Sequence, residues 1–397
     1  MPADTVVVGA GAFGLSAALA LAARGRHVRV LDPGPIPHPL AASTDISKVM
    51  RLAYGADELY TALAEEARAE WLRWNEERRR RGKPPLYRET GILVLTEAPM
   101  APGGFEYESW QLLLKRGHTP QRIDPSKLKE RFPAFRHRFG DGFFHGLGGY
   151  VESAAAIAEM ADRAIAAGVE LVTGSHVQSL LVESGAVRGV RDDSGERHFA
   201  SDVVLAAGAW TARLLPELSR SLIPTAHALF YLRPRSPERF LPPRFPVFTA
   251  DITRTGYYGF PLSSDGLVKI GSHGPGLAIG PDSDRTVPPA ETERLRQFLR
   301  EWLPDLADAA ISSSRLCWYC DTPDGDFWIA RHPEVEGLVV ASGDSGHGFK
   351  FAPVLGRIVA DAVEELPSPY LERFRWRPEL RAAQFREAAR YGGAPRA

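Results

Sequence analysis

The sequence has very little cysteine and almost no net charge. Its 397 residues include two cysteines, and 48 Lys and Arg stand against 49 Asp and Glu, which gives a formal net charge of -1. Two cysteines cannot form a disulfide scaffold, and their scarcity is typical of a reducing compartment. The balanced charge argues against a general nucleic-acid or membrane-surface binder, because both need a basic excess. With 44% hydrophobic residues, the chain is long enough for two or three globular domains.

One long hydrophobic run imitates a membrane or targeting segment. Residues 5–23, "TVVVGAGAFGLSAALALAA", carry no charge and are almost long enough to span a bilayer. However, the preceding "MPAD" lacks the basic residues of a signal peptide, and three glycines interrupt the run. We therefore interpret this run as a buried strand, a turn and a helix, and we expect a cytoplasmic protein without a membrane partner.

The glycines of this run have the spacing of a dinucleotide-binding motif. "TVVV" is a β-branched run suited to a buried strand, "GAGAFG" follows as G-x-G-x-x-G, and "HVRVLD" predicts a second strand ending in Asp32. Gly9 permits the tight turn, Gly11 lets a pyrophosphate approach the backbone, and Gly14 lets the helix pack on the sheet. The helix N-terminus stabilises phosphate charge, and Asp32 can accept hydrogen bonds from a ribose diol. The complete unit predicts an adenine dinucleotide site.

The later chain favours FAD over a nicotinamide cofactor. Residues 169–210 predict a strand, a β-meander and the segment "DVVLAAGAW", an order typical of FAD-binding domains. Residues 337–365 predict a third strand, a glycine-rich loop and a helix, whose amides and positive end would favour negative charge on a reduced flavin.

The remaining segments predict an inserted second domain. Residues 55–82 are expected to be helical, with Trp71 and Trp74 in the core and the basic run 78–83 as a solvated helix end. Residues 99–145 are expected to be loop and helix, residues 216–275 antiparallel sheet, and residues 288–304 an amphipathic helix. The predicted fold is α/β plus antiparallel β: a discontinuous FAD-binding Rossmann-like domain of the glutathione reductase type (1–90, 148–215, 316–385) with a substrate domain (91–147, 216–315).

Five stretches together resemble the monomeric sarcosine oxidase family of flavin amine oxidases. They are the N-terminal unit, "KVMRLAYG" (48–55), "GYYGFPLSSDGLVKIGSHG" (256–274), "CWYCDTPDGDFWIARHP" (317–333) and "GDSGHGFKF" (343–351). Relatives of that family include pipecolate oxidase, N-methyltryptophan oxidase and, more distantly, fructosyl amino acid oxidases. The resemblance implies an oxidase of secondary amino acids that uses FAD and O2 and works as a monomer, with no metal.

The same resemblance gives the two cysteines in "RLCWYC" different roles. Cys317 matches the position that carries the flavin as an 8α-thioether in the family. A redox CxxC site belongs at a helix N-terminus, whereas this run predicts a strand, and a zinc site would need further ligands at short spacing. Positions 317 and 320 of a strand point to opposite faces. We expect Cys317 to anchor the flavin and Cys320 to be a small buried packing residue.

The resemblance also implies which side chains meet the substrate and oxygen. Lys269 matches the lysine that supplies positive charge over the flavin for oxygen reduction, and Arg51 and Lys350 match the pair that binds the substrate carboxylate. The expected catalytic set is Lys269, Arg51, Lys350, Tyr258, Tyr319, His273 and Lys48. The expected cofactor-binding set is Gly9, Gly11, Phe13, Gly14, Asp32, Ser43, Thr44, Val177, Gly208, Trp210, Cys317, Gly343, Gly346, His347, Gly348 and Lys350.

Departures from the family pattern leave the substrate open. Thr44 and Lys48 replace a histidine and an arginine common in sarcosine oxidases, and Asp344 replaces a larger apolar residue. "DSGH" and "CW" are more similar to fructosyl amino acid oxidases, which take bulky sugar-bearing amines. Two alternatives therefore remain beside a secondary amino acid oxidase: a fructosyl amino acid oxidase, and an amine dehydrogenase using an acceptor other than O2. A flavin-bound sensor without activity is disfavoured by the intact Arg51, Lys269, Cys317 and Lys350.

Overall fold

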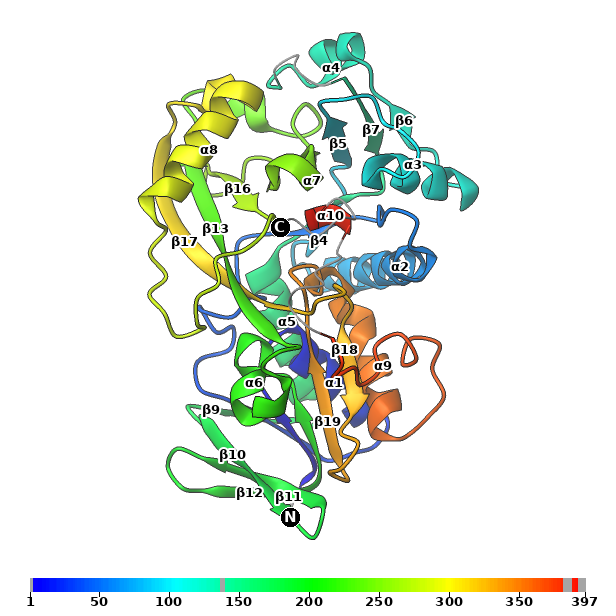
Figure 1. Ribbon diagram of the computed structural model, residues 1–397, viewed down its shortest axis with the longest axis vertical. Helices are drawn as coiled ribbons and strands as arrows, with labels where there is room; N and C mark the ends of the chain where they lie inside the picture. Colours follow the sequence, from blue (N-terminus) through cyan, green and yellow to red (C-terminus); the bar gives the residue numbers. More distant parts are fainter. Residues whose placement is uncertain (1–2, 136–139, 381–387, 392–397) are drawn as a thin grey trace.

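The chain forms two large sheets that lie end to end (Figure 1). The computed structural model describes residues 3–135, 140–380 and 388–391. In Figure 1 the sheet that begins with β1 occupies the lower half, and the second sheet occupies the upper half together with α8 and α4. Within the described residues, no helix combines the length and apolar composition needed to span a bilayer.

The first sheet is a parallel core with a meander at one side. β1 (Ala3–Val8) pairs in parallel with β2 (Val28–Asp32) and with β12 (Arg197–Leu205). The other members are β9 (Glu170–Thr173), β10 (Val177–Glu183), β11 (Ala186–Asp192), β18 (Trp328–Arg331) and β19 (Leu338–Ser342). Three helices pack over one face, namely α1 (Ala12–Ala23), α5 (Ser153–Ala166) and α9 (Ala352–Val363). This arrangement confirms the predicted strand–helix–strand unit, meander and third unit.

The apolar pattern of β1 explains why it lies at the centre of this sheet. Val7 belongs to the core under the helices, while Val6 and Val8 belong to the core on the meander side. All three are at most 6% exposed. A strand buried on both faces needs a continuous β-branched run, and "TVVV" provides it.

The second sheet is mixed, where the sequence had indicated an antiparallel one. It runs β17 (Ala310–Asp321), β13 (Ile223–Arg233), β16 (Val268–Ser272), β15 (Tyr257–Gly259), β14 (Val247–Ala250), β5 (Ile92–Thr96), β7 (Asp141–His145) and β6 (Gln121–Arg122). β14 and β5 pair in parallel. β6 and β7 lie inside residues 99–145, which we had expected to be loop and helix. Both are short, so their strand conformation depends on pairing, of β7 with β5 and of β6 with β7, rather than on a long local pattern.

Side chains that follow one another along a strand of the second sheet point to opposite faces, and this decides which of them face the middle of the molecule. Val268 and Ile270 of β16 pack in the core that contains Leu295, Phe298, Leu299 and Trp302 of α8 (Pro289–Trp302). Lys269, between them, points to the opposite face and is fully buried. Its register partner on β13 is Tyr231, which packs with Leu229, Cys317 and Tyr319. The sheet therefore presents Lys269 and Cys317 on one face, away from α8.

Smaller elements join the two sheets. α2 (Glu58–Arg80) begins at Asp57, whose side chain accepts the amide of Tyr60 at 3.0 Å, and it buries Trp71 and Trp74 as the sequence predicted. A three-stranded sheet is formed by β3 (Lys48–Met50), β8 (Gly149–Val151) and β4 (Tyr87–Arg88). The remaining helices are α3 (Phe105–Lys115), α4 (Pro125–Arg131), α6 (Thr211–Leu214), α7 (Ile252–Thr255) and α10 (Ala388–Tyr391).

The domain limits stay a prediction. The predicted limit at residue 316 falls inside β17, whose Cys320 packs in the core of the first sheet while Leu316 packs under α8. α10 lies beyond the predicted domains, at the centre of Figure 1, and packs on α7.

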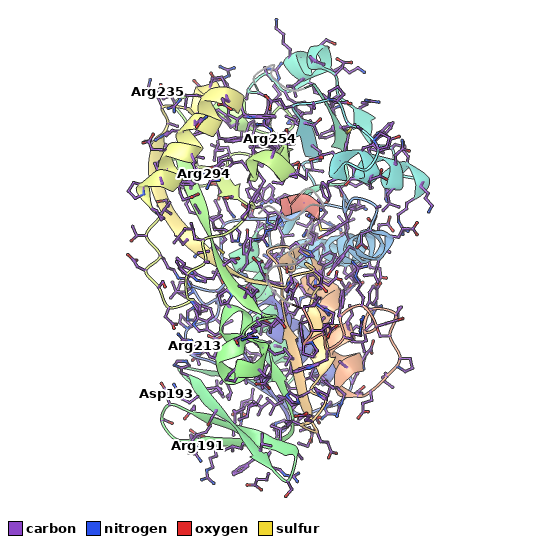
Figure 2. All side chains as sticks on the ribbon, viewed as in Figure 1. Arg191, Asp193, Arg213, Arg235, Arg254 and Arg294 are labelled. Carbon is purple, nitrogen blue, oxygen red and sulfur yellow. The ribbon has the colours of Figure 1, made fainter. Side chains whose placement is uncertain are left out.

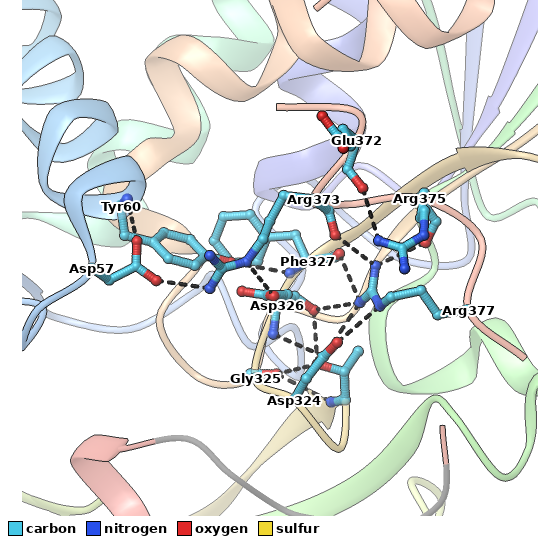
Figure 3. Close-up of polar contacts among 12 residues, drawn as sticks. Asp57, Tyr60, Asp324, Gly325, Asp326, Phe327, Glu372, Arg373, Arg375 and Arg377 are labelled. Atoms are coloured by element: carbon cyan, nitrogen blue, oxygen red, sulfur yellow. Dashed lines mark hydrogen bonds and ion pairs between the residues drawn. The ribbon is translucent and has the colours of Figure 1, made fainter. Parts of the chain in front are cut away.

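Arg373 and Arg377, which follow α9, bind the turn after β17 through ion pairs and hydrogen bonds. Figure 3 shows Arg373 between Asp57 and Asp326, and Arg377 beside Asp324. Arg377 also donates to the Phe327 carbonyl at 3.2 Å. These contacts fix residues 322–327, because guanidinium groups can bind several oxygens in one plane.

Candidate active site

A large cavity lies beside the glycine loop between β1 and α1. Its volume is about 530 Å³. It is lined by ten of the predicted cofactor-binding residues: Gly9, Gly11, Phe13, Asp32, Ser43, Val177, Gly208, Trp210, Gly346 and Gly348. Arg213 of α6, labelled in Figure 2, lies at the same cavity and pairs with Asp282, which also accepts the Trp210 indole N–H at 2.8 Å.

The three positions of the motif require glycine for different reasons. Gly9 has φ +102°, and a Cβ there would lie 2.6 Å from the Ala206 carbonyl oxygen. A Cβ on Gly14 would lie 1.8 Å from the Gly9 oxygen, so this residue serves helix packing and does not line the cavity. A Cβ on Gly11 would meet only the Ser43 hydroxyl, at 3.4 Å, and would otherwise project into the cavity. Gly11 therefore leaves room for a ligand rather than for protein.

Polar groups at this cavity fit a dinucleotide. Asp32 is 6% exposed and its Oδ2 accepts the Ala10 amide at 2.8 Å, which fixes the carboxylate at the end of β2. Among the described residues, the buried Ser43 hydroxyl at the cavity has no hydrogen-bond partner; the Thr44 hydroxyl also has none, but Thr44 does not line the cavity. A buried hydroxyl without a partner is costly unless a ligand supplies one. These features and the space at Gly11 fit FAD.

A second, small cavity opens beside the first. Its volume is about 70 Å³, and Lys48, Tyr319, Gly346 and Phe349 line both cavities. It brings together the predicted Arg51, Tyr258, His273, Tyr319, His347 and Lys350. Its apolar wall consists of Ile92, Val94, Phe105, Ile252 and Ala389. The position and lining of this cavity suit a small polar molecule held against the end of a larger cofactor.

Arg51 and Lys350 meet around Tyr54. The Arg51 guanidinium lies 4.2 Å from the centre of the Tyr54 ring and donates to the Ala53 carbonyl. Lys350 is 4% exposed and donates to the Tyr54 hydroxyl at 2.9 Å and to the His347 carbonyl at 2.7 Å. Two cations at one end of a small cavity are suited to binding a carboxylate.

The hydrogen bonds of His347 keep Tyr54 in place. His347 Nε2 lies 2.9 Å from the Gly325 carbonyl, which can only accept, so this nitrogen carries the proton. Nδ1 is then an acceptor for the Tyr54 hydroxyl at 3.3 Å. Gly325 belongs to the turn held by Arg373 and Arg377 (Figure 3). The turn thus sets the orientation of Tyr54, which the sequence analysis missed although it lies inside "KVMRLAYG".

The tyrosines of the small cavity are neutral. Burial raises the pKa of Tyr258 and of Tyr319 well above their usual range. His227 of β13 stacks on Tyr319 with ring centroids 3.9 Å apart, and burial, with the nearby Arg390 charge, lowers the pKa of His227. These rings supply hydrogen-bonding surface without adding charge near Arg51 and Lys350.

Lys269 is the most deeply buried cation of the predicted set. Its Nζ lies 2.6 Å from Asp45 Oδ2 and 4.6 Å from the centre of the Phe260 ring. Burial lowers the pKa of Lys269 to about 8, although the Asp45 charge opposes this shift. Burial would raise the pKa of Asp45, but the charges of Lys269, Lys48 and Arg315 outweigh it and hold it below its usual range. The pair is therefore ionised at neutral pH.

The two cysteines lie in different surroundings. Cys317 is 1% exposed and packs with Leu229, Tyr231 and Tyr319 on the face of the sheet that carries Lys269. Cys320 points to the other side, and its sulfur accepts the Ser342 hydroxyl at 3.4 Å. Burial raises the pKa of the Cys320 thiol to about 12, which makes it a poor nucleophile. Both residues are free thiols in β17, next to but not lining the large cavity.

Asp344 is a half-buried acid that lines the large cavity. Its Oδ1 accepts the Gly346 amide at 2.8 Å, and burial raises its pKa to about 6. Gly343, which we had assigned to the cofactor, does not line the cavity; its missing Cβ makes room for Thr322 and Trp328. Sequence reasoning also missed Asp45, although it lies between the matched Thr44 and Lys48, and Ala389, which lies in no recognisable motif.

The chain matches the family described as FAD dependent oxidoreductase over residues 4–362. The chain belongs to this family. It is 31% identical over 382 residues to an N-methyl-L-tryptophan oxidase of Salmonella arizonae, covering 94% of this chain and 98% of that one. It is 27% identical over 363 residues to the monomeric sarcosine oxidase of a Bacillus species, covering 90% and 91%.

Solved structures give the same family relationship. Fructosamine oxidase (Amadoriase II) of Aspergillus fumigatus, in complex with FSA, superimposes with a TM-score of 0.81 at 29% identity, covering 95% of this chain and 90% of that one. Fructosyl peptide oxidase from E. terrenum gives a TM-score of 0.84 at 25% identity, covering 99% and 95%. The protein is thus a flavoprotein oxidoreductase related to the amine oxidases, and the predicted fold class is confirmed.

Proposed function

We propose that the protein oxidises a secondary amino acid, such as sarcosine, an N-methyl amino acid or pipecolate, with O2 as the electron acceptor. FAD held by the residues of the large cavity would supply the two-electron oxidation of the amine C–N bond to an imine, which water hydrolyses, and O2 with the two electrons and two protons released would give H2O2. The protein residues supply position and charge for these steps. The observation that carries the proposal is the meeting of Arg51 and Lys350 in a small cavity that joins the large one.

Arg51 and Lys350 orient the substrate through its carboxylate. The Arg51 fork suits the two carboxylate oxygens, and Lys350, held by Tyr54 and the His347 carbonyl, adds a fixed positive charge. The amine end then points toward Tyr258, Tyr319 and the junction with the large cavity. His273 and Lys48 lie at the same cavity, and we propose them as further contacts of substrate and cofactor.

Lys269 and Cys317 act on the cofactor side. A fixed cation lowers the cost of adding an electron to O2 where water is excluded, and Lys269 is fully buried. Cys317 lies on the same face of the second sheet and would hold the flavin covalently. The other cofactor contacts that we propose are those that line the large cavity.

A fructosyl amino acid oxidase is the second candidate. Asp344 and the similarity to fructosamine oxidase favour it. The volume of the small cavity and its apolar wall favour a smaller N-substituent, because each sugar hydroxyl would need a buried partner.

A substrate panel tests the proposal. Peroxide release would be measured with sarcosine, N-methyl amino acids, pipecolate and fructosyl valine, each beside its analogue without the carboxylate. We expect turnover of at least one carboxylate-bearing secondary amine and poor turnover of its decarboxylated partner. Equal turnover of both members of a pair would contradict carboxylate binding, and preference for fructosyl valine would establish the second candidate.

A further inference from the structure

Asp45 is buried against Lys269, outside the residues assigned so far. It lies in the segment before β3, and its side chain is 2% exposed. Lys269 Nζ lies 2.6 Å from Asp45 Oδ2 and donates to the Ser47 carbonyl, also at 2.6 Å. The Lys269 ammonium therefore makes one ion pair and one hydrogen bond with oxygens of one short segment, residues 45–47.

Asp45 is itself fixed at its second oxygen. Oδ1 accepts the Tyr231 hydroxyl at 2.6 Å and the Ile46 amide at 2.7 Å. Its main-chain carbonyl accepts the Ser153 hydroxyl at 2.7 Å and the Ala154 amide at 3.0 Å, at the start of α5. Tyr231 is also the register partner of Lys269 in the sheet. The carboxylate is thus held from two elements and has little freedom to follow the lysine.

The charges around the pair make Lys269 dependent on Asp45. Lys48 Nζ and Arg315 Nη2 lie 3.9 and 3.7 Å from Asp45 Oδ2, so one carboxylate faces three cations. Burial and the Lys48 charge both act against the protonated form of Lys269, whereas the Asp45 charge acts in its favour. Removing the negative charge would leave a fully buried ammonium beside two like charges.

We propose that Asp45 is a positioning residue for the oxygen step, holding Lys269 at one point and in its charged form, with Tyr231 bracing the carboxylate. This inference rests on the proposed role of Lys269. The segment 45–47 does not line the small cavity, and of the three cations that Asp45 faces, Lys269 lies nearest to the carboxylate.

Asp45→Asn tests the proposal because it keeps the shape and removes the charge. The rate at which O2 reoxidises the substrate-reduced holoenzyme would be followed by stopped flow from pH 6 to pH 10. In the wild type this rate should fall as pH rises through about 8, where Lys269 loses its proton. In Asp45→Asn the fall should move down by about one pH unit or more, the usual effect of a close opposite charge.

A double variant that combines Asp45→Asn with Lys269→Met shows whether Asp45 acts by positioning Lys269 or by a general effect on the structure. Asp45→Asn should add no further change in the Lys269→Met background, because Asp45 acts through Lys269. Asp141→Asn is the matched control: Asp141 is also buried and paired, with Arg122, but it lies on β7 at the far side of the second sheet. Its pH profile should match the wild type.

Unfolding of the flavin-loaded protein gives a readout without turnover. The Lys269 pKa is lower in the folded protein than its ordinary value of 10.5, so the unfolded chain binds more protons between about pH 8 and 10.5. This group therefore makes stability rise with pH in that window. The rise of the free energy of unfolding with pH should begin at lower pH in Asp45→Asn, and the part due to Lys269 should be absent in Lys269→Met.

The outcomes are distinguishable. Suppose that Lys269→Met slows reoxidation but that in Asp45→Asn the pH dependence of reoxidation and of stability has the wild-type midpoints. The Asp45 proposal is then wrong and the role of Lys269 stands. If Lys269→Met reoxidises at the wild-type rate, both are wrong. If Asp45→Asn does not load flavin, Tyr231→Phe carries the test: it should slow reoxidation about two- to tenfold, the range for one lost hydrogen bond. A wild-type rate in Tyr231→Phe would then overturn the proposal.

Discussion

The two cavities of this oxidoreductase are lined by different kinds of residue. Glycines and alanines are frequent in the lining of the large cavity, while the small one is lined by cations, tyrosines and an apolar wall. Backbone and small residues can surround a large cofactor closely, and consecutive residues provide them. A small polar substrate needs charged groups from several directions, and here Arg51, Tyr258 and Lys350 come from three distant segments. The glycine loop of the large cavity therefore depends on local sequence, whereas the cation pair of the small cavity depends on how distant segments pack.

The largest effect is expected at the glycine motif, where two substitutions separate packing from ligand space. Gly14→Ala would place a Cβ 1.8 Å from the Gly9 oxygen, so α1 must move and the protein should fail to fold or to load FAD. Gly11→Ala meets only the Ser43 hydroxyl, so the fold should lose at most about 1 kcal/mol while FAD content falls. Circular dichroism and the flavin-to-protein absorbance ratio would measure both. Normal FAD content in Gly11→Ala would show that the cofactor does not approach this loop.

The next prediction concerns covalent flavin attachment at Cys317, which should be either fully present or absent. Cys317→Ser should abolish in-gel flavin fluorescence after denaturation, because the sulfur on the Lys269 face forms the expected thioether. Cys320→Ser is the control, since Cys320 lies on the other side of β17 against Ser342 and should keep the fluorescence. Loss of fluorescence in Cys320→Ser alone would reverse the assignment.

Carboxylate binding should change KM when either cation of the small cavity is removed. Arg51→Gln and Lys350→Met should each raise KM roughly thirty- to hundredfold, the scale of a lost hydrogen bond to a charged group at about 2–3 kcal/mol. Steady-state kinetics with the best substrate of the panel would measure this. Arg122→Gln is the control and should leave KM unchanged, because the half-exposed Arg122 pairs with Asp141 away from the cavity. An unchanged KM in both cavity variants would place the carboxylate elsewhere.

The smallest effect on catalysis is expected in the sheet behind the small cavity, where the prediction concerns stability. His145 pairs in register with Ile92 of the cavity wall, and burial lowers its pKa to about 4. Between pH 6.5 and 4 the unfolded chain binds a proton that the folded protein excludes, so stability should fall on acidification, by at most about 3 kcal/mol from this group. His145→Phe should reduce this slope, measured as denaturant midpoints from pH 7 to 4. An identical slope in the variant would assign the loss to other groups.

The sequence was informative wherever function depends on consecutive residues. "TVVVGAGAFG" predicted the strand, loop and helix because apolar pattern and glycine spacing act locally, and "RLCWYC" predicted a strand with its cysteines on opposite faces. The strands β6 and β7 were missed because short strands are stabilised by pairing rather than by their own pattern. The parallel pairing of β14 with β5 was missed for the same reason.

By itself, the sequence determined the strand–glycine loop–helix unit, the meander and the residues that can carry charge, because these follow from periodicity and side-chain chemistry. Only the tertiary structure decided which charges meet. Asp45 and Lys269 are 224 positions apart and come within 2.6 Å because the segment before β3 crosses the inner face of the second sheet. Tyr54 joins Arg51 and Lys350 in the same way. Such contacts depend on how distant elements pack, and no local pattern encodes them.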